Sequence, residues 1–140
     1  MGRNWQVFAA PGGDEPLVGG PHPWIQHRSV YIPLEHWGLL LDRAQLDDAA
    51  LTQRLELVSG SVDPLAEEDI EVPDAELSEL ADFVDALADR VESGPDLTDQ
   101  PTPEIPDAYT SEEHARMLRS VGLVFRESLR TGRPARSWKE

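Results

Sequence analysis

The clearest pattern of apolar and polar residues in this 140-residue chain falls in residues 73–95. Apolar side chains recur there at steps of three and four, which places them on one stripe of an α-helix. They are Leu77, Leu80, Val84, Leu87 and Val91. Seven of the other positions are acidic, and Arg90 is the one basic residue of the stretch. With Asp74 suited to cap the helix and Gly94 suited to end it, the pattern predicts an acidic helix over residues 74–93.

Residues 110–131 repeat this periodicity with basic side chains on the flanks. Thr110 and Glu113 have the spacing of a capping box, and Gly132 is suited to end the helix. The apolar stripe consists of Leu118, Val121, Val124, Phe125 and Leu129. We therefore expect the two helices to pack stripe against stripe, with arginines of one helix along aspartates of the other. The residues concerned are Arg116, Arg119 and Arg126, and Asp82, Asp85 and Asp89.

The N-terminal part of the chain combines aromatic residues with many glycines and prolines. Residues 5–9 and 28–32 are rich in aromatic and β-branched side chains, which favours a pair of short strands. The Gly- and Pro-rich sequence between them excludes a helix, so we expect residues 1–33 to form this strand pair and a long aromatic-rich loop. Residues 34–60 then carry apolar residues at helical spacing and predict two short helices.

Three further segments join or end these elements. Residues 61–73 form an acidic connector and residues 94–109 a proline-rich linker. Residues 132–140 form a basic tail, which is either a frayed terminus or a short docking element anchored by Trp138. The expected fold is α+β and predominantly helical, with a short N-terminal strand pair and about four helices packed as one domain over residues 1–140.

The charge of the chain is strongly negative and unevenly distributed. The formal net charge is −15, from 27 acidic and 12 basic residues. This balance disfavours direct binding of nucleic acid, because phosphate contacts require cationic side chains. Residues 116–140 nevertheless hold seven basic and only two acidic residues. The eleven Arg against one Lys are typical of a GC-rich bacterial genome.

The composition also excludes several kinds of chemistry and location. The chain has no cysteine, which rules out disulfides and thiolate catalysis. It contains neither a signal-peptide pattern nor the ~20 consecutive apolar residues that cross a bilayer. We therefore expect a cytoplasmic protein that makes no contact with a membrane.

No sequence motif for catalysis or cofactor binding is present. The four histidines match no metal-binding spacing, and the serines and glycines match neither a nucleophile elbow nor a phosphate loop. We therefore predict no catalytic residue, no metal and no other cofactor. If a small-molecule pocket exists, its best lining residues are the aromatic and histidine side chains of the N-terminal part, although these also suit simple core packing. The candidates are Trp24, His27, Tyr31, His36 and Trp37, with Trp5 beside them.

Two classes of function remain open. The first is a non-catalytic binding module that presents an anionic helical surface to a basic protein, as an immunity or antitoxin-like inhibitor or a DNA mimic does. Its contact residues are Glu76, Glu79, Asp82, Asp85, Asp89 and Trp138. Self-association through the helical stripe is a further possibility in this class, and an acidic face that only keeps the protein in solution is the plainest interpretation. The alternative is a small enzyme or a domain that binds a metal or small molecule, with the N-terminal pocket as its site.

Overall fold

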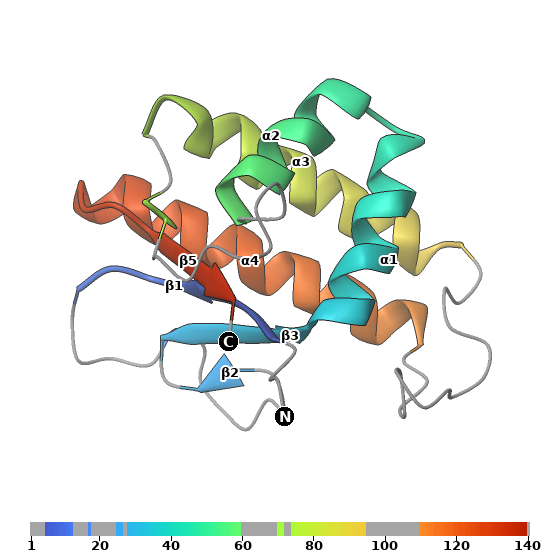
Figure 1. Cartoon of the computed structure of the whole chain (residues 1–140), viewed down its shortest axis with the longest axis horizontal. Helices are drawn as coiled ribbons and strands as arrows, with labels where there is room; N and C mark the ends of the chain where they lie inside the picture. The colour runs from blue at the N-terminus through green and yellow to red at the C-terminus, as the bar shows by residue number, and fades with distance from the viewer. Residues whose placement is uncertain are drawn as a thin grey trace.

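The computed structural model describes residues 5–12, 17, 25–26, 28–59, 70–71, 74–94 and 110–139. Its strands form one small antiparallel sheet, and four helices lie on one side of that sheet (Figure 1). The fold is α+β and predominantly helical, which confirms the class predicted from the sequence.

The centre of the sheet consists of three strands from distant parts of the chain. β1 (Trp5–Ala9) lies between β3 (Ser29–Pro33) and β5 (Arg136–Lys139), and all neighbours are antiparallel. Two-residue strands, β2 (Ile25–Gln26) and β4 (Ile70–Glu71), pair at the two edges. The predicted pairing of the two N-terminal strands is therefore confirmed, and it forms part of a larger sheet.

The C-terminal segment differs from its prediction. Residues 136–139 are neither a frayed tail nor a free docking element, because β5 pairs with both β1 and β4. The Ser137 side chain is buried and donates a hydrogen bond to the carbonyl of Val58. The error has a physical cause: four residues are too few for a reliable strand pattern, and the partner strand β1 lies at the opposite end of the sequence.

The four helices begin and end close to the predicted positions. They are α1 (Leu34–Gln45), α2 (Ala49–Ser59), α3 (Asp74–Glu92) and α4 (Ser111–Thr131). The capping box at the start of α4 is confirmed, since the Thr110 hydroxyl accepts from the Glu113 amide and the Glu113 carboxylate accepts from the Thr110 amide. At the other end, Gly132 adopts the left-handed conformation with φ of 71°.

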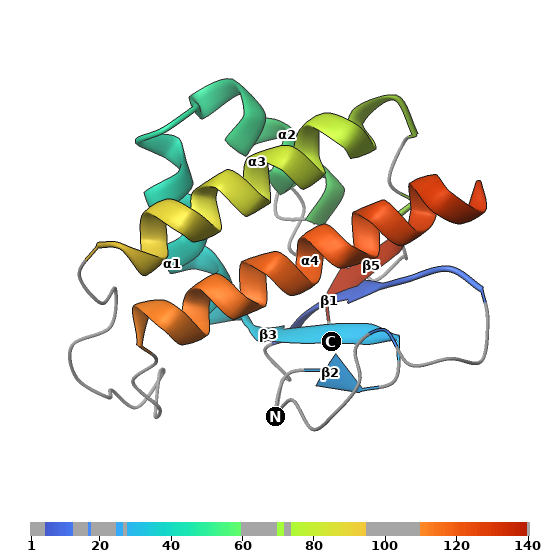
Figure 2. The same cartoon turned by 180° about the vertical axis from the view of Figure 1, so that it is seen from behind.

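The helices α3 and α4 lie side by side, as predicted, and they run in opposite directions (Figure 2). All five members of the apolar stripe of α3 are buried. On α4 the stripe is buried from Leu118 to Phe125, but Leu129 is 44% exposed, which corrects its predicted place in the core.

Aromatic side chains join the sheet to the helices. Phe8 of β1 makes edge contacts with Trp37 of α1 and Phe125 of α4, with ring centroids 5.2 and 5.9 Å apart. Val30 and Ile32 of β3 face the same core. Burial of these large side chains supplies most of the favourable free energy of folding, at about 1.5–3 kcal/mol for each.

Candidate functional site

The acidic residues predicted to bind a partner lie along the exposed side of α3. Glu79, Asp82 and Asp89 are exposed, and Asp85 is half-buried. The side chain of Glu76 lies outside the described residues. α3 thus presents carboxylates on two edges, one facing α4 and the other facing the corner between α1 and α2.

The edge of α3 that faces α4 is occupied by ion pairs within the molecule. Arg126 bonds to both Asp85 and Asp82, and Arg119 bonds to Asp89 at 2.8 Å and to Glu92 at 3.2 Å. Hydrogen bonds to Glu92 and then to Asp89 raise the pKa of Arg119 above its ordinary value. The predicted alignment of arginines with aspartates is confirmed for Arg119 and Arg126. These pairs offset much of the negative charge that the aspartates would otherwise show to a partner.

The third arginine of that prediction takes a different partner. Arg116 bonds to Glu112 on its own helix at 2.6 Å. The two side chains are four residues apart, a spacing that brings them onto the same face of the helix. Arg116 therefore does not join the row of pairs between α3 and α4.

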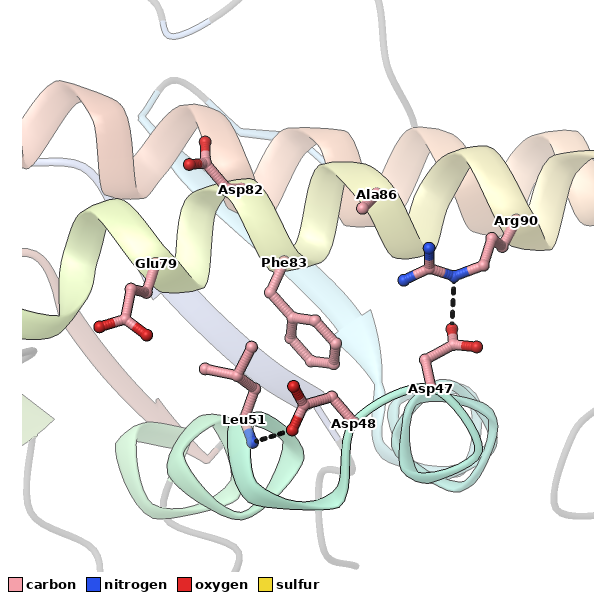
Figure 3. A pocket seen from close by; sticks show the side chains of 8 residues that line it. All are labelled: Asp47, Asp48, Leu51, Glu79, Asp82, Phe83, Ala86 and Arg90. Atoms are coloured by element: carbon pink, nitrogen blue, oxygen red, sulfur yellow. Dashed lines mark hydrogen bonds and ion pairs between the residues drawn. The ribbon is translucent and has the colours of Figure 1, made fainter.

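The other edge of α3 borders a shallow pocket of about 370 Å³ (Figure 3). The corner between α1 and α2 forms the opposite wall. The pocket is lined by Asp47, Asp48, Leu51, Glu79, Asp82, Phe83, Ala86 and Arg90. Phe83 is nearly buried and points from α3 towards Leu51, so these two side chains form an apolar floor between the carboxylates (Figure 3).

Two of the pocket's four carboxylates stabilise the corner between α1 and α2. Asp48 accepts a hydrogen bond from the Leu51 amide at 3.0 Å and so caps the first turn of α2. Asp47 accepts from Arg90 at 2.8 Å and from Arg43 at 3.0 Å. Partial burial acts to raise the pKa of Asp47, but the hydrogen bonds from the two arginines outweigh it and hold the pKa below its ordinary value. Asp47 therefore stays ionised near neutral pH, and both residues hold the corner in place.

The other two carboxylates project into solvent at the rim. The side chain of Glu79 is 61% exposed and that of Asp82 is 77% exposed. Each has one arginine at 3.2 Å, Arg54 for Glu79 and Arg126 for Asp82. Exposed pairs of this kind are held by only about 0–1 kcal/mol, so an incoming cation can displace them. An apolar floor with a carboxylate rim suits the methylene stem and charged head of Lys or Arg.

The alternative pocket in the N-terminal part does not form from its described members. Tyr31 alternates with the core residues Val30 and Ile32, and it therefore lies on the face of the sheet away from the helices. His36 and Trp37 are buried on the helical side. The sheet separates these residues, which corrects the expectation that they line one pocket. Trp24 and His27 lie outside the described residues.

The remaining aromatic candidates also have packing roles. Trp5 makes an edge contact with Tyr31, with ring centroids 6.3 Å apart. Trp138 stands in β5 opposite Val7 of β1 and is half-buried. A Trp138 side chain fixed in the sheet is not available as the anchor of a flexible docking segment.

A buried contact between His36 and His114 escaped the sequence analysis. Nδ1 of His36 lies 2.9 Å from Nε2 of His114, although the residues are 78 positions apart. The available signal was the position of His114, three and four residues before the buried Met117 and Leu118 on the inner face of α4. In the part of the chain that the structure covers, no three His, Asp or Glu side chains gather as a metal site would require.

The described helices also include none with the length and apolarity needed to cross a membrane. Comparison of the chain with protein-family models, with curated proteins and with solved structures gave no match. The function is therefore inferred from the geometry of this chain alone.

Proposed function

We propose that this protein is a small non-catalytic binding module that recognises a basic protein. The pocket between α2 and α3 receives a Lys or Arg side chain of the partner, with Glu79 and Asp82 as its contacts. The observation that carries this proposal is a pocket of about 370 Å³ with an apolar floor and a charged rim. Leu51 and Phe83 form the floor, and the two exposed carboxylates of Glu79 and Asp82 lie on the rim. An immunity or antitoxin-like inhibitor and a DNA mimic are the functional classes that fit such a surface.

The pocket edge of α3 is better suited to a partner than the edge that faces α4. Binding at Asp85 or Asp89 would disrupt the pairs that these residues make with Arg126 and Arg119. Those pairs also join two helices, so their loss would disturb the packing of the domain. At the pocket, by contrast, the partner's cation displaces Arg54 from Glu79 and Arg126 from Asp82. Arg126 keeps its bond to Asp85, which still joins the two helices.

The acidic segments of the chain strengthen the attraction at longer range. Residues 60–76 contain seven acidic residues, and residues 95–109 contain four, with no Lys or Arg in either segment. Negative charge of this density raises the rate of association with a basic protein and makes that rate sensitive to salt. Affinity then comes from the pocket contacts, and the remaining charge brings the partner to them.

A titration with a short oligoarginine peptide tests this assignment. At low salt, the amide resonances of residues 47–51 and 79–90 in the isotope-labelled chain are expected to shift and to saturate. Replacement of both rim residues (Glu79→Gln with Asp82→Asn) should weaken binding by up to about thirtyfold, since each exposed pair is worth about 0–1 kcal/mol. The matched control is Glu56→Gln with Glu112→Gln, which removes the same charge at residues that do not line the pocket.

The pattern of results decides between pocket recognition and general attraction. If the two double variants lose affinity equally, total charge alone governs binding and the pocket has no role. The same conclusion follows if the shifts spread evenly over the surface. Loss confined to the Glu79 and Asp82 variant supports the pocket.

A further inference from the structure

The buried contact between His36 and His114 joins the first turns of two helices. His36 is the third residue of α1 and His114 is the fourth residue of α4. Both side chains are buried, and the ring nitrogens lie 2.9 Å apart. The ring planes are tilted by 45°, with centroids 5.1 Å apart. This geometry is that of an N–H donor facing a nitrogen acceptor.

Such a hydrogen bond limits how many protons the pair can hold. A neutral imidazole offers one donor and one acceptor, whereas a protonated imidazole offers two donors and no acceptor. The pair can therefore exist with both rings neutral or with one ring protonated. When both rings are protonated, two N–H groups and two positive charges face each other and the bond is lost.

The surroundings of the pair also oppose positive charge. Burial favours the neutral imidazole. Both rings lie in the first turn of a helix, where the unpaired amides give a partial positive charge. Glu112 is bonded to Arg116, and Glu92 at the end of α3 is bonded to Arg119.

The other charged or titratable groups on these elements are few. Glu113 caps α4 through Thr110, and Tyr31 of β3 lies on the opposite face of the sheet. Glu35 precedes His36 in α1, and β1 has no charged residue. The carboxylates of Glu112 and Glu113 thus have hydrogen-bond partners at the start of α4 itself.

We propose that His36 and His114 form a pH-sensitive latch between α1 and α4. The latch is closed when at least one ring is neutral, and it opens when both rings are protonated. It operates independently of the proposed binding function, because neither histidine lines the pocket.

Proton linkage gives the direction and size of the effect. In the open form each exposed imidazole takes up its proton near pH 6.5. The closed form holds at least one proton fewer than the open form below that pH. The equilibrium constant for opening should therefore rise at least about tenfold for each pH unit below about 6.5.

Amide hydrogen exchange on the full chain provides the test. Protection factors, corrected for the intrinsic exchange rate, are compared between about pH 7.5 and pH 5.5. We expect protection of residues 38–41 and 115–118 to fall about tenfold over the last pH unit. Protection of residues 80–88 in α3 should fall less, because that segment is remote from the latch in sequence and packs through apolar side chains.

A variant without titratable rings separates the latch from general acid effects. His36→Gln combined with His114→Gln keeps a donor and an acceptor at both positions, and its protection should not depend on pH in this range. Equal losses in the variant and the native chain would overturn the proposal. Should the variant not fold, NMR titration of the two rings in the native chain decides: two protonated rings with α1 still protected at pH 5.5 would also overturn it.

Discussion

The backbone of Gly122 in α4 lies against the side chain of Asp85 in α3. A Cβ atom at position 122 would come within 2.7 Å of the carboxylate oxygen Oδ1 of Asp85 and within 3.4 Å of Arg126. The two helices thus approach closely beside one of the ion pairs that join them. A Cβ atom fits at this position only if the Asp85 carboxylate moves, although glycine is otherwise unfavourable inside a helix.

We expect Gly122→Ala to leave the stability of the protein about unchanged. The new Cβ atom displaces the Asp85 carboxylate from Arg126, and the loss of this pair, worth about 0–1 kcal/mol, offsets the gain of up to about 1 kcal/mol from the better helix propensity of alanine. Gly38 in α1 is the matched control, since a Cβ atom there would meet nothing within 4 Å. Gly38→Ala should therefore stabilise the protein by about 0.5–1 kcal/mol. Urea unfolding of both variants measures this difference in stability, and an equal stabilisation by the two substitutions would contradict the close approach.

Leucine burial should contribute more to stability than the ion pairs between α3 and α4. Leu87 is fully buried between the helices, and Leu87→Ala should cost about 2–5 kcal/mol. Arg119→Ala removes two exposed pairs worth about 0–1 kcal/mol each. Thermal and urea unfolding measure the loss of stability in each of the two variants. A larger loss in Arg119→Ala would mean that charge, and not the apolar stripe, holds the helices together.

Stability in acid should depend on Glu127. Hydrogen bonds from Arg130 and then from Arg28 lower the pKa of Glu127 from 4.5 to about 2. A carboxylate with a lowered pKa stabilises the folded state fully above its unfolded value and loses that contribution as the pH falls. The advantage of the native chain over Glu127→Gln should therefore be constant above about pH 5 and shrink between about pH 4.5 and pH 2. Urea unfolding at a series of pH values measures this difference, and a difference that stays constant across that window would show that the pairs with Arg130 and Arg28 are both weak.

The hydroxyl of Ser137 should contribute more to the stability of the folded protein than the hydroxyl of an exposed serine does. Ser137 is buried in β5 and donates to the carbonyl of Val58, whereas the Ser93 hydroxyl bonds to the carbonyl of Asp89 at the solvent-exposed end of α3. Ser137→Ala leaves a buried carbonyl without this donor and should cost about 1–3 kcal/mol. Ser93→Ala should change stability by less than about 0.5 kcal/mol. Equal effects in denaturant melts would place the Ser137 hydroxyl in contact with water.

The sequence predicted those features whose cause is local. The stripe from Leu77 to Val91 repeats at the helical period, and the Thr110 capping box is complete within four residues. Likewise, the alignment of Arg126 with Asp85 followed from two strongly patterned helices that had to bury their stripes together.

Features that depend on distant pairing were not predictable in this way. β5 is a strand because β1 offers it an edge, and nothing in its four residues shows that. The pocket at Glu79 arises where the corner at Asp48 meets α3, so no single segment contains its pattern. The contact between His36 and His114 likewise required the relative placement of α1 and α4.

The pairing of β1 with β5 also sets the order in which the strands of the sheet can pair. Gln6 lies opposite Lys139, so the first and last described strands are neighbours in the sheet. During synthesis, β1 can pair with β3 early but must keep its second edge open until β5 leaves the ribosome. A chain truncated before residue 136 would expose this strand edge to other nascent chains.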